Sequence, residues 1–264
     1  MVRFTVSEQE LRDLLRGLPL GGLRYFSQIG STNDEALAWA AAGASDFSLV
    51  AADEQSAGRG RAKRKWFTPP GAALAFSLVL RPNASESEFI GRFSGLAALA
   101  LVNALQKYGV SAQIKWPNDV LIQRKKVAGI LVESAWQGAK IESVIVGMGV
   151  NATPEAIPPA SGLTFPATCL AAAGLNLPSR FDLLKNVLKE LISLRAALAS
   201  DAFLRQWQAS LAFGGETVQL LSEDAPALTG QIEGLEPDGS LRMRLFPSGA
   251  VQTVHFGEIH LRPL

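Results

Sequence analysis

Four apolar segments of strand length lie one after another between residues 113 and 150, and only short turns separate them. The segments are residues 113–116, 120–123, 127–136 and 141–150. The turns lie at residues 117–119 and 124–126 and at Gly138. Connections this short join antiparallel neighbours, because a parallel pair needs a crossover of about a dozen residues or more. This stretch therefore predicts a largely antiparallel sheet.

Helical patterns surround these segments. Ser7 and Glu10 have the spacing of a helix capping box, and Thr32 and Glu35 repeat that spacing ahead of an alanine-rich run that ends at Gly43. Further helices are predicted at residues 86–108, 181–199 and 202–211, and further strands at residues 23–29, 47–53 and 73–81. The sequence thus predicts an α+β fold, a mixed and largely antiparallel sheet backed by helices.

The pattern becomes entirely β after Gly214 and Gly215. Short strands are predicted at residues 217–221, 228–235, 241–245 and 250–256, with turns at residues 237–239 and 247–249. Short strands at regular spacing are typical of a small barrel. We therefore expect two domains, residues 1–212 and 213–264.

Composition limits the classes of protein. The formal net charge is +1, so no overall field attracts the chain to nucleic acid or to an anionic membrane. Cys169 is the single cysteine and cannot form an intrachain disulfide. The first residues lack the basic and apolar regions of a signal peptide, and the apolar stretches are too short to span a bilayer. We expect a cytoplasmic protein without a membrane partner.

Residues 58–66 read GRGRAKRKW and concentrate five cations beside one tryptophan. Gly58 and Gly60 let the backbone approach a ligand closely, and arginine side chains offer planar donors to phosphate. The alternatives are a solvated basic loop, or a nucleic-acid patch in which Trp66 stacks on bases. The segment lacks the spacing of a Walker loop.

Two further clusters follow. Residues 115–119 read KWPND and residues 126–130 read KVAGI, and their polar groups would converge on an anion if the turn brings them together. The alternative is a plain turn with an exposed hairpin lysine. Residues 147–151 read GMGVN at the end of an apolar strand, which is compatible with close strand packing as well as with a ligand site.

Taken together and in order, these motifs resemble the catalytic domain of the biotin protein ligases. The resemblance rests on the following stretches: Ser31-Thr32-Asn33, Gln55, residues 58–66, 115–119, 126–133 and 147–151, and the tail at residues 257–262. It implies a class II synthetase-like biotin/lipoate ligase catalytic domain followed by a small SH3-like β-barrel.

Two departures from the family pattern are visible. The family loop carries Arg-Gly where this chain has Ala62 and Lys63, so we expect one contact of the loop to be lost or replaced. Only some thirty residues precede Ser31, which leaves no room for the DNA-binding domain of some relatives. By resemblance we expect the monofunctional type, with no DNA partner.

The resemblance implies that biotin and ATP form biotinyl-5′-AMP and that biotin then passes to a lysine of a biotin carboxyl carrier protein or domain. Arg61 and Lys126 are the expected catalytic residues, since positioned cations are the main requirement of the first step. The expected biotin-binding residues are Ser31, Thr32, Asn33, Gln55, Arg59, Gly60, Arg61, Lys126 and Gly129. The expected nucleotide-binding residues are Gly58, Arg61, Arg64, Trp66, Asn118, Asp119, Lys126, Gly147, Gly149, Asn151 and Arg262.

Mg²⁺ is expected because ATP carries it, and no ligands are assigned to it. We expect residues 59–65 and the proline-rich residues 152–162 to move when no ligand is bound. A lipoate ligase of the same fold is the nearest alternative, and a nucleic-acid-binding protein that uses residues 58–66 is a remote one. The sequence does not decide between a monomer and a homodimer. A homodimer would form if an edge strand of the main sheet paired across a two-fold axis.

Overall fold

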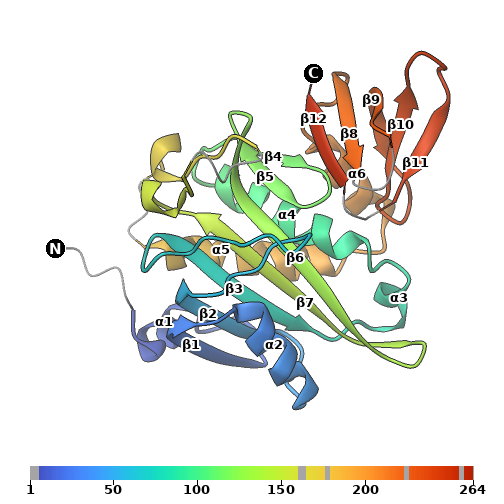
Figure 1. Cartoon of the computed structure of the whole chain (residues 1–264). Coiled ribbons are helices and arrows are strands. Elements are labelled where there is room, and N and C mark those ends of the chain that lie inside the picture. Colours follow the sequence, from blue (N-terminus) through green and yellow to red (C-terminus); the bar gives the residue numbers. More distant parts are fainter. Residues whose placement is uncertain (1–5, 160–164, 176–178, 223–225, 256–258, 264) are drawn as a thin grey trace.

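The computed structural model describes residues 6–159, 165–175, 179–222, 226–255 and 259–263, and it contains two sheets (Figure 1). The larger is seven-stranded, with the order β1-β2-β3-β7-β6-β5-β4. Its strands are β1 (Gly22–Ile29), β2 (Ser48–Gln55), β3 (Ala73–Leu80), β4 (Gln113–Lys115), β5 (Asp119–Ile122), β6 (Lys125–Gln137) and β7 (Lys140–Asn151). β1 and β2 are parallel, and all other neighbours are antiparallel. The predicted mixed, largely antiparallel sheet is confirmed.

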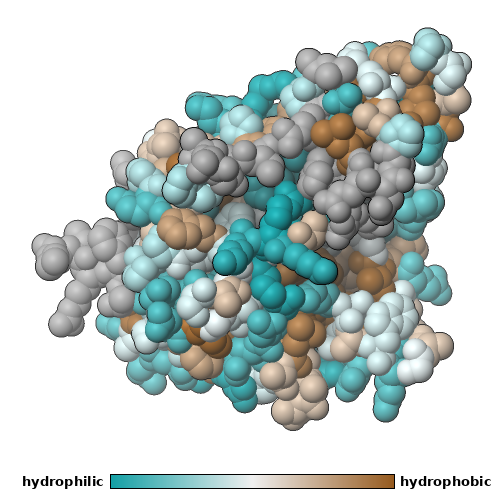
Figure 2. Space-filling model, viewed as in Figure 1, coloured by the Kyte–Doolittle hydropathy of each residue, from teal (hydrophilic) through white to brown (hydrophobic). Residues whose placement is uncertain are grey.

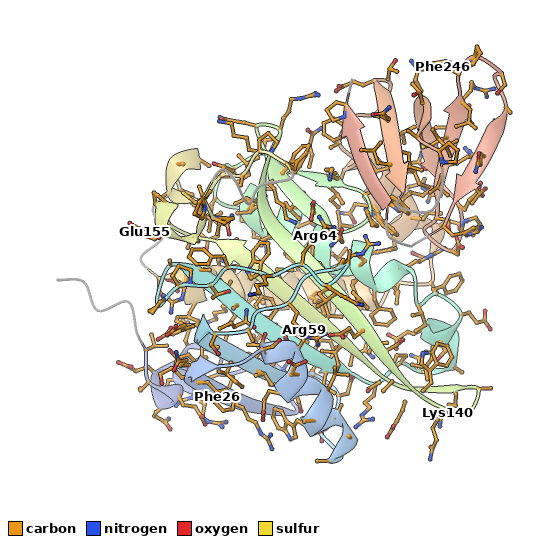
Figure 3. All side chains as sticks on the ribbon, in the orientation of Figure 1. Phe26, Arg59, Arg64, Lys140, Glu155 and Phe246 are labelled. Carbon is orange, nitrogen blue, oxygen red and sulfur yellow. The ribbon has the colours of Figure 1, made fainter. Side chains whose placement is uncertain are left out.

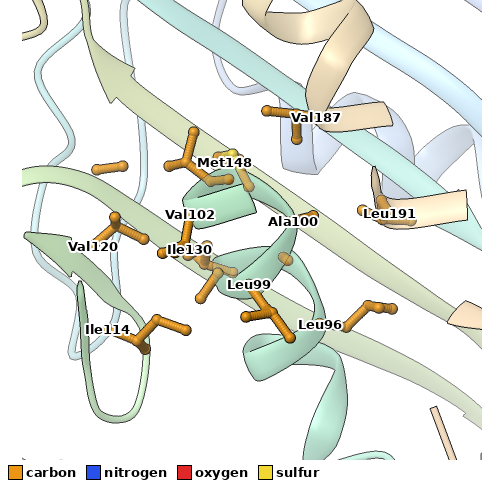
Figure 4. Packing of buried hydrophobic residues seen from close by; sticks show 14 of the residues in the cluster. Leu96, Leu99, Ala100, Val102, Ile114, Val120, Ile130, Met148, Val187 and Leu191 are labelled. Atoms are coloured by element: carbon orange, nitrogen blue, oxygen red, sulfur yellow. The ribbon is translucent and has the colours of Figure 1, made fainter. Parts of the chain in front are cut away.

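Helices cover both faces of this sheet. They are α1 (Glu8–Leu14), α2 (Thr32–Ala41), α3 (Ala84–Ser87), α4 (Arg92–Gln106), α5 (Arg180–Arg195) and α6 (Asp201–Ala209). Leu96 and Leu99 of α4 and Val187 and Leu191 of α5 belong to the main core, which also takes alternate residues of the strands (Figure 4). α2 covers the opposite face of the sheet. Its Ala36 and Ala40 pack against Val50, Val79 and Ile145, the strand residues that point to that face.

Two details of the helix predictions are wrong. The predicted helix at residues 86–108 is two helices, because Asn83 and Glu86 form a capping box that begins α3, and α4 begins anew after Gly91. The predicted capping box of Thr32 and Glu35 does not form. Ser31 occupies the N-cap position without a side-chain cap bond, and the Thr32 hydroxyl donates to Gln55 instead.

The C-terminal sheet is five-stranded and antiparallel, with the order β11-β10-β9-β8-β12. Its strands are β8 (Thr217–Ser222), β9 (Leu228–Leu235), β10 (Leu241–Leu245), β11 (Val251–Val254) and β12 (Ile259–Pro263). It lies beside α6, at the upper right of Figure 1, and its short antiparallel strands are consistent with the predicted SH3-like unit. Among the described residues, no helix is long and apolar enough to cross a bilayer.

Candidate active site

Residues 58–66 form a basic loop. A cavity of about 430 Å³ lies between this loop and strands β5, β6 and β7. Figure 2 shows hydrophilic side chains gathered in the middle of this face, where Figure 3 places Arg59 and Arg64. The predicted residues that line the cavity are Ser31, Thr32, Asn33, Gln55, Arg59, Gly60, Arg61, Arg64, Trp66, Asn118, Asp119, Lys126, Gly129, Gly147, Gly149 and Asn151. Motifs that are far apart in the sequence therefore meet around one cavity.

Asp119 connects two lysines at this cavity. Its Oδ1 lies 2.6 Å from Lys126 Nζ, and its Oδ2 lies 3.5 Å from Lys115 Nζ. Burial alone would raise the pKa of this carboxyl group, but the charges and hydrogen bonds of Lys126 and Lys115 outweigh it and hold the pKa below its ordinary value. Asp119 is therefore an ionised anchor that keeps both ammonium groups at the cavity wall.

Arg61 meets the same turn from the other side. Its Nη1 donates to Asn118 Oδ1 at 3.2 Å, and Asn118 Nδ2 donates to the Ile130 carbonyl at 2.8 Å. Adjacent residues, Asn118 and Asp119, thus hold Arg61 and Lys126. The two cations that the sequence singled out lie at one wall of one cavity.

Arg59 has a different environment. Its guanidinium donates two hydrogen bonds to the Glu133 carboxylate, at 2.9 and 2.7 Å, and also forms an ion pair with Asp34. Hydrogen bonding to Glu133, the largest influence, raises the pKa of Arg59 despite partial burial. Because its charge is already compensated, Arg59 acts here as the tether that holds the loop against β6 and α2.

Polar side chains from three elements form a network at the far end of the cavity. The Thr32 backbone N–H donates to Gln55 Oε1 at 2.8 Å, and Gln55 Nε2 donates to Thr68 Oγ1 at 3.2 Å. Ser77 Oγ donates to Asn33 Oδ1 at 2.6 Å. These bonds fix the orientation of the Thr32, Asn33 and Gln55 side chains before a ligand arrives.

Trp66 lies over a floor of small residues. Gly129 and Gly149 are directly opposite each other in β6 and β7. A Cβ added to Gly149 would lie 2.2 Å from Trp66 Nε1, and one added to Gly129 would lie 3.1 Å from Trp66 Cζ3. The missing side chains therefore make room for the indole. Trp66 Nε1 is buried and has no hydrogen-bond partner within the described part of the chain.

Comparison with known proteins identifies the family. The model of the Biotin/lipoate A/B protein ligase family matches residues 25–151. The biotin--[acetyl-CoA-carboxylase] ligase of Paracoccus denitrificans is 38% identical over 221 residues, which cover 81% of this chain and 90% of that protein. This chain belongs to the biotin protein ligase family.

Other relatives agree with this assignment. The biotin protein ligase of Aquifex aeolicus, solved in complex with biotin and ATP, has a TM-score of 0.77 and 28% identity, and the match covers 92% of this chain and 99% of that one. The bifunctional ligase/repressor BirA of Bacillus spizizenii is 35% identical over 185 residues, and this chain spans 57% of its length.

The departure of this chain from the family pattern at Ala62 and Lys63 has a structural consequence. Both residues have positive φ, +53° and +54°, and the Arg64 N–H donates to the Arg61 carbonyl at 3.1 Å. This geometry is that of a type I′ turn, which favours Asn-Gly because both central residues are left-handed. The loop of this chain closes with two residues that disfavour its turn.

Of the two remaining predicted residues, Gly58 does not line the cavity, and the side chain of Arg262 is not described. Gly58 is buried behind the loop, where its carbonyl accepts from the Trp66 N–H at 2.8 Å and an added Cβ would lie 2.5 Å from the Trp66 carbonyl oxygen. Arg262 lies in β12 and pairs with Gln219 of β8, and its side chain is outside the described part of the structure. The tail residues Gly257 and Glu258 also lie outside it.

Lys115 belongs to the motif at residues 115–119 but was not among the assigned site residues. This lysine lines the cavity, is only 7% exposed, and lies with its ammonium 4.6 Å from the centroid of the Phe165 ring. Its place directly before the turn that carries Asn118 and Asp119 was the available signal. Glu133, which orients Arg59, ends the motif at residues 126–133 but was given no role, and Ser77, which orients Asn33, lies in a strand without a motif.

The described residues do not form a magnesium cage. No group of three or more potential ligands among His, Cys, Asp and Glu exists within them, and Asp119 is the carboxylate among the described lining residues. Asp119 is already engaged by two lysines. A protein-held Mg²⁺ therefore does not fit this wall, and no step is assigned to the ion.

Proposed function

We propose that this protein is an ATP-dependent biotin protein ligase, which forms biotinyl-5′-AMP and transfers biotin to a lysine of a biotin carboxyl carrier protein or domain. One observation carries the proposal beyond the family assignment. Arg61 and Lys126 meet at Asn118 and Asp119 on a cavity that also has a preorganised polar end. Two anions must meet in the first step, and this wall supplies the compensating charge.

In the first step the biotin carboxylate attacks the α-phosphorus of ATP, and pyrophosphate leaves. Negative charge accumulates on the phosphorus oxygens in the transition state, so fixed cations stabilise it more than they stabilise the separate substrates. We assign Arg61 and Lys126 to that charge, with Lys115 as a third cation behind Asp119. Asp119 holds the lysines in place and does not transfer a proton.

We assign the polar end to the biotin ring. The Thr32, Asn33 and Gln55 side chains, together with Ser31, would hydrogen-bond the ureido group, and Gly60 and Gly129 would line the ring and its chain. The phosphates and adenosine would lie toward Arg64, Trp66 and Asn151, with Gly149 giving room to the Trp66 indole and Gly147 giving room to the Asn33 side chain.

In the second step the amine of the acceptor lysine attacks the carbonyl of the mixed anhydride. The amide bond forms, the bond from the acyl carbon to the phosphate oxygen breaks, AMP leaves, and the amine loses a proton. The anhydride hydrolyses readily, so closure of residues 59–65 would protect it.

Binding of labelled biotin and labelled lipoate, followed by transfer to a carrier domain, tests the proposal. We expect saturable biotin binding, no comparable lipoate binding, and ATP-dependent labelling that disappears when the acceptor lysine is changed to arginine. Preferential lipoate binding would move the protein to the lipoate branch of the fold. Salt-dependent association with DNA in place of biotin binding would support the nucleic-acid alternative.

A further inference from the structure

A turn of the C-terminal sheet contacts the motif that holds both catalytic cations. Trp116 follows Lys115 at the end of β4 and is 1% exposed. Its indole N–H donates to the carbonyl oxygen of Gly239 at 3.0 Å. Gly239 lies between β9 and β10, so residues 123 positions apart in the sequence are joined at a buried site.

The first turn of α4 holds the same two turns together. Arg92 Nε donates to the Pro237 carbonyl at 2.7 Å, and Ser94 Oγ donates to the Pro117 carbonyl at 2.7 Å. Arg92 is 1% exposed, and burial, the largest influence, lowers its pKa although the charges of Asp201 and Asp238 act in the opposite direction. A cation placed this deep indicates that the junction is built to hold its geometry.

The turn that presents Gly239 is itself constrained. Asp238 accepts hydrogen bonds from the Ser240 N–H and from the Ser240 hydroxyl, both at 2.8 Å. The Glu236 N–H donates to the Ser240 carbonyl at 2.8 Å, and the Gly239 N–H donates to the Glu236 carbonyl at 2.8 Å. The Gly239 carbonyl is therefore offered to Trp116 from a fixed position.

On the other side of Trp116, the chain reaches Asn118 and Asp119 within three residues. Asn118 accepts from Arg61, and Asp119 pairs with Lys126. A displacement of Trp116 therefore moves both anchors together, and with them both cations.

We propose that Trp116 is a positioning residue and that the β9–β10 turn, through Gly239, fixes the place of Arg61 and Lys126 at the cavity wall. The catalytic consequence rests on the proposed function. Under this proposal the C-terminal sheet contributes to adenylate formation through the buried hydrogen bond between Trp116 and Gly239. This contribution needs no contact between the sheet and the substrates.

The test compares Trp116→Phe with Trp136→Phe. Phenylalanine keeps most of the aromatic volume at position 116 but leaves the buried Gly239 carbonyl without that donor. Trp136 is 54% exposed and also donates its indole N–H, to Ser134, so its replacement is a matched control. We expect Trp116→Phe to lower kcat for biotin-dependent adenylate formation about tenfold with an unchanged KM for biotin, because small displacements of positioned groups slow catalysis. Equal kcat in the two variants would overturn the proposal.

A double-mutant cycle separates positioning from simple packing. Asp238 is exposed, and Asp238→Ala removes the hydrogen bonds from Ser240 that constrain the β9–β10 turn. If the turn acts through Trp116, the double variant is no slower than Trp116→Phe alone. Multiplying effects would overturn the proposal. Should Trp116→Phe fail to fold, Asp238→Ala alone decides, since it must lower kcat without a comparable change in KM.

A readout without substrates keeps this test apart from the proposed function. In wild type and Asp238→Ala, solvent exchange of the Trp116 indole proton is followed by NMR, with the Trp207 indole proton as the reference. We expect Asp238→Ala to speed exchange at Trp116 selectively, by about fivefold or more, as local opening becomes easier. An unchanged exchange rate at Trp116 would overturn the proposal that the β9–β10 turn positions this residue, even if the protein forms biotinyl-AMP. A wild-type protein that forms no biotinyl-AMP would instead refute the proposed function.

Discussion

Lys126 of β6 forms an ion pair with Asp119 of β5, with 2.6 Å between Nζ and Oδ1. The lysine lines the cavity with its ammonium 5.4 Å from the centroid of the Trp66 ring. Replacing it with alanine removes a charge from the wall while Lys115 stays in contact with Asp119. We predict that Lys126→Ala lowers the single-turnover rate of adenylate formation by about 10²-fold or more. Lys140→Ala, at an exposed hairpin residue, is the control and should leave the rate unchanged.

An unchanged rate in Lys126→Ala would remove this lysine from the reaction. A rise in KM for biotin with kcat intact would assign it to ground-state binding only.

Asp119→Asn should change the pH dependence of stability. The folded protein holds the pKa of this carboxyl group below its unfolded value of about 4. Its contribution is therefore complete above that value and is lost as the pH falls through the lowered folded pKa. At about pH 7 the substitution should cost roughly 3 kcal/mol of unfolding free energy, since two lysines lose a buried carboxylate. The difference from wild type should narrow in acid, measured by denaturant titration. A difference that stays constant would show that Asp119 is not an ionised anchor.

Arg61→Gly should loosen retention of the adenylate. Asn118 holds Arg61 at the cavity wall, and we expect the guanidinium to donate charge-assisted hydrogen bonds to the adenylate. Losing such bonds costs about 1.5–3 kcal/mol, or roughly 10- to 100-fold in dissociation rate. Released biotinyl-AMP, measured by rapid filtration, should increase. Arg61→Lys keeps the charge but lacks the planar guanidinium, so it should release an amount of biotinyl-AMP between those of wild type and Arg61→Gly. If Arg61→Gly releases no more adenylate than wild type, the assigned role is wrong.

Ala62→Asn combined with Lys63→Gly should stabilise the closed loop. The φ angles of +53° and +54° favour Asn-Gly at these positions, and a non-glycine residue in this region costs about 1 kcal/mol or more. Hydrogen exchange of the Gly60 amide, which donates to the Arg64 carbonyl at 2.7 Å, reports the opening of the loop. We predict exchange slower by about fivefold. Unchanged or faster exchange would mean that the turn is not a weak point.

Biotin should order the loop before ATP binds. Arg61 and Arg64 belong to a loop closed by an unfavourable turn, so the ATP site is incomplete until a ligand beneath the loop supports it. Calorimetric titration of ATP onto biotin-free protein should therefore show weak binding, strengthened by prior addition of a non-reactive biotin analogue. Tight ATP binding to the biotin-free protein would contradict this order.

Local signals predicted much of the fold. The strands at residues 113–150 were predictable because their short turns permit one pairing only, and β4 to β7 lie in that order. The parallel pairing of β1 with β2 was not predicted, although a helix between two strands is the crossover that parallel neighbours need. Helix propensity across residues 86–108 likewise hides the break at Gly91, which depends on separate contacts made by Glu86 with Arg195 and by Arg92 with Pro237.

The residues of the candidate site were predictable where they belong to recognisable sequence motifs. Lys126 and Arg61 were identifiable because cations and glycines cluster around them, whereas their joint attachment to Asn118 and Asp119 is a tertiary relationship. The compensation of Arg59 by Glu133 was also not predictable, because the two residues are 74 positions apart in the sequence and only the folded sheet brings them together. Pairings of this kind depend on strand register, which one sequence does not specify.

The most direct measurement incubates the protein with biotin and with ATP labelled at the α-phosphate, and separates the nucleotides. Labelled biotinyl-AMP should appear only when biotin is present, should be almost absent with Lys126→Ala, and should have no counterpart when lipoate replaces biotin. Wild-type protein that binds both substrates but forms no biotinyl-AMP would contradict the account.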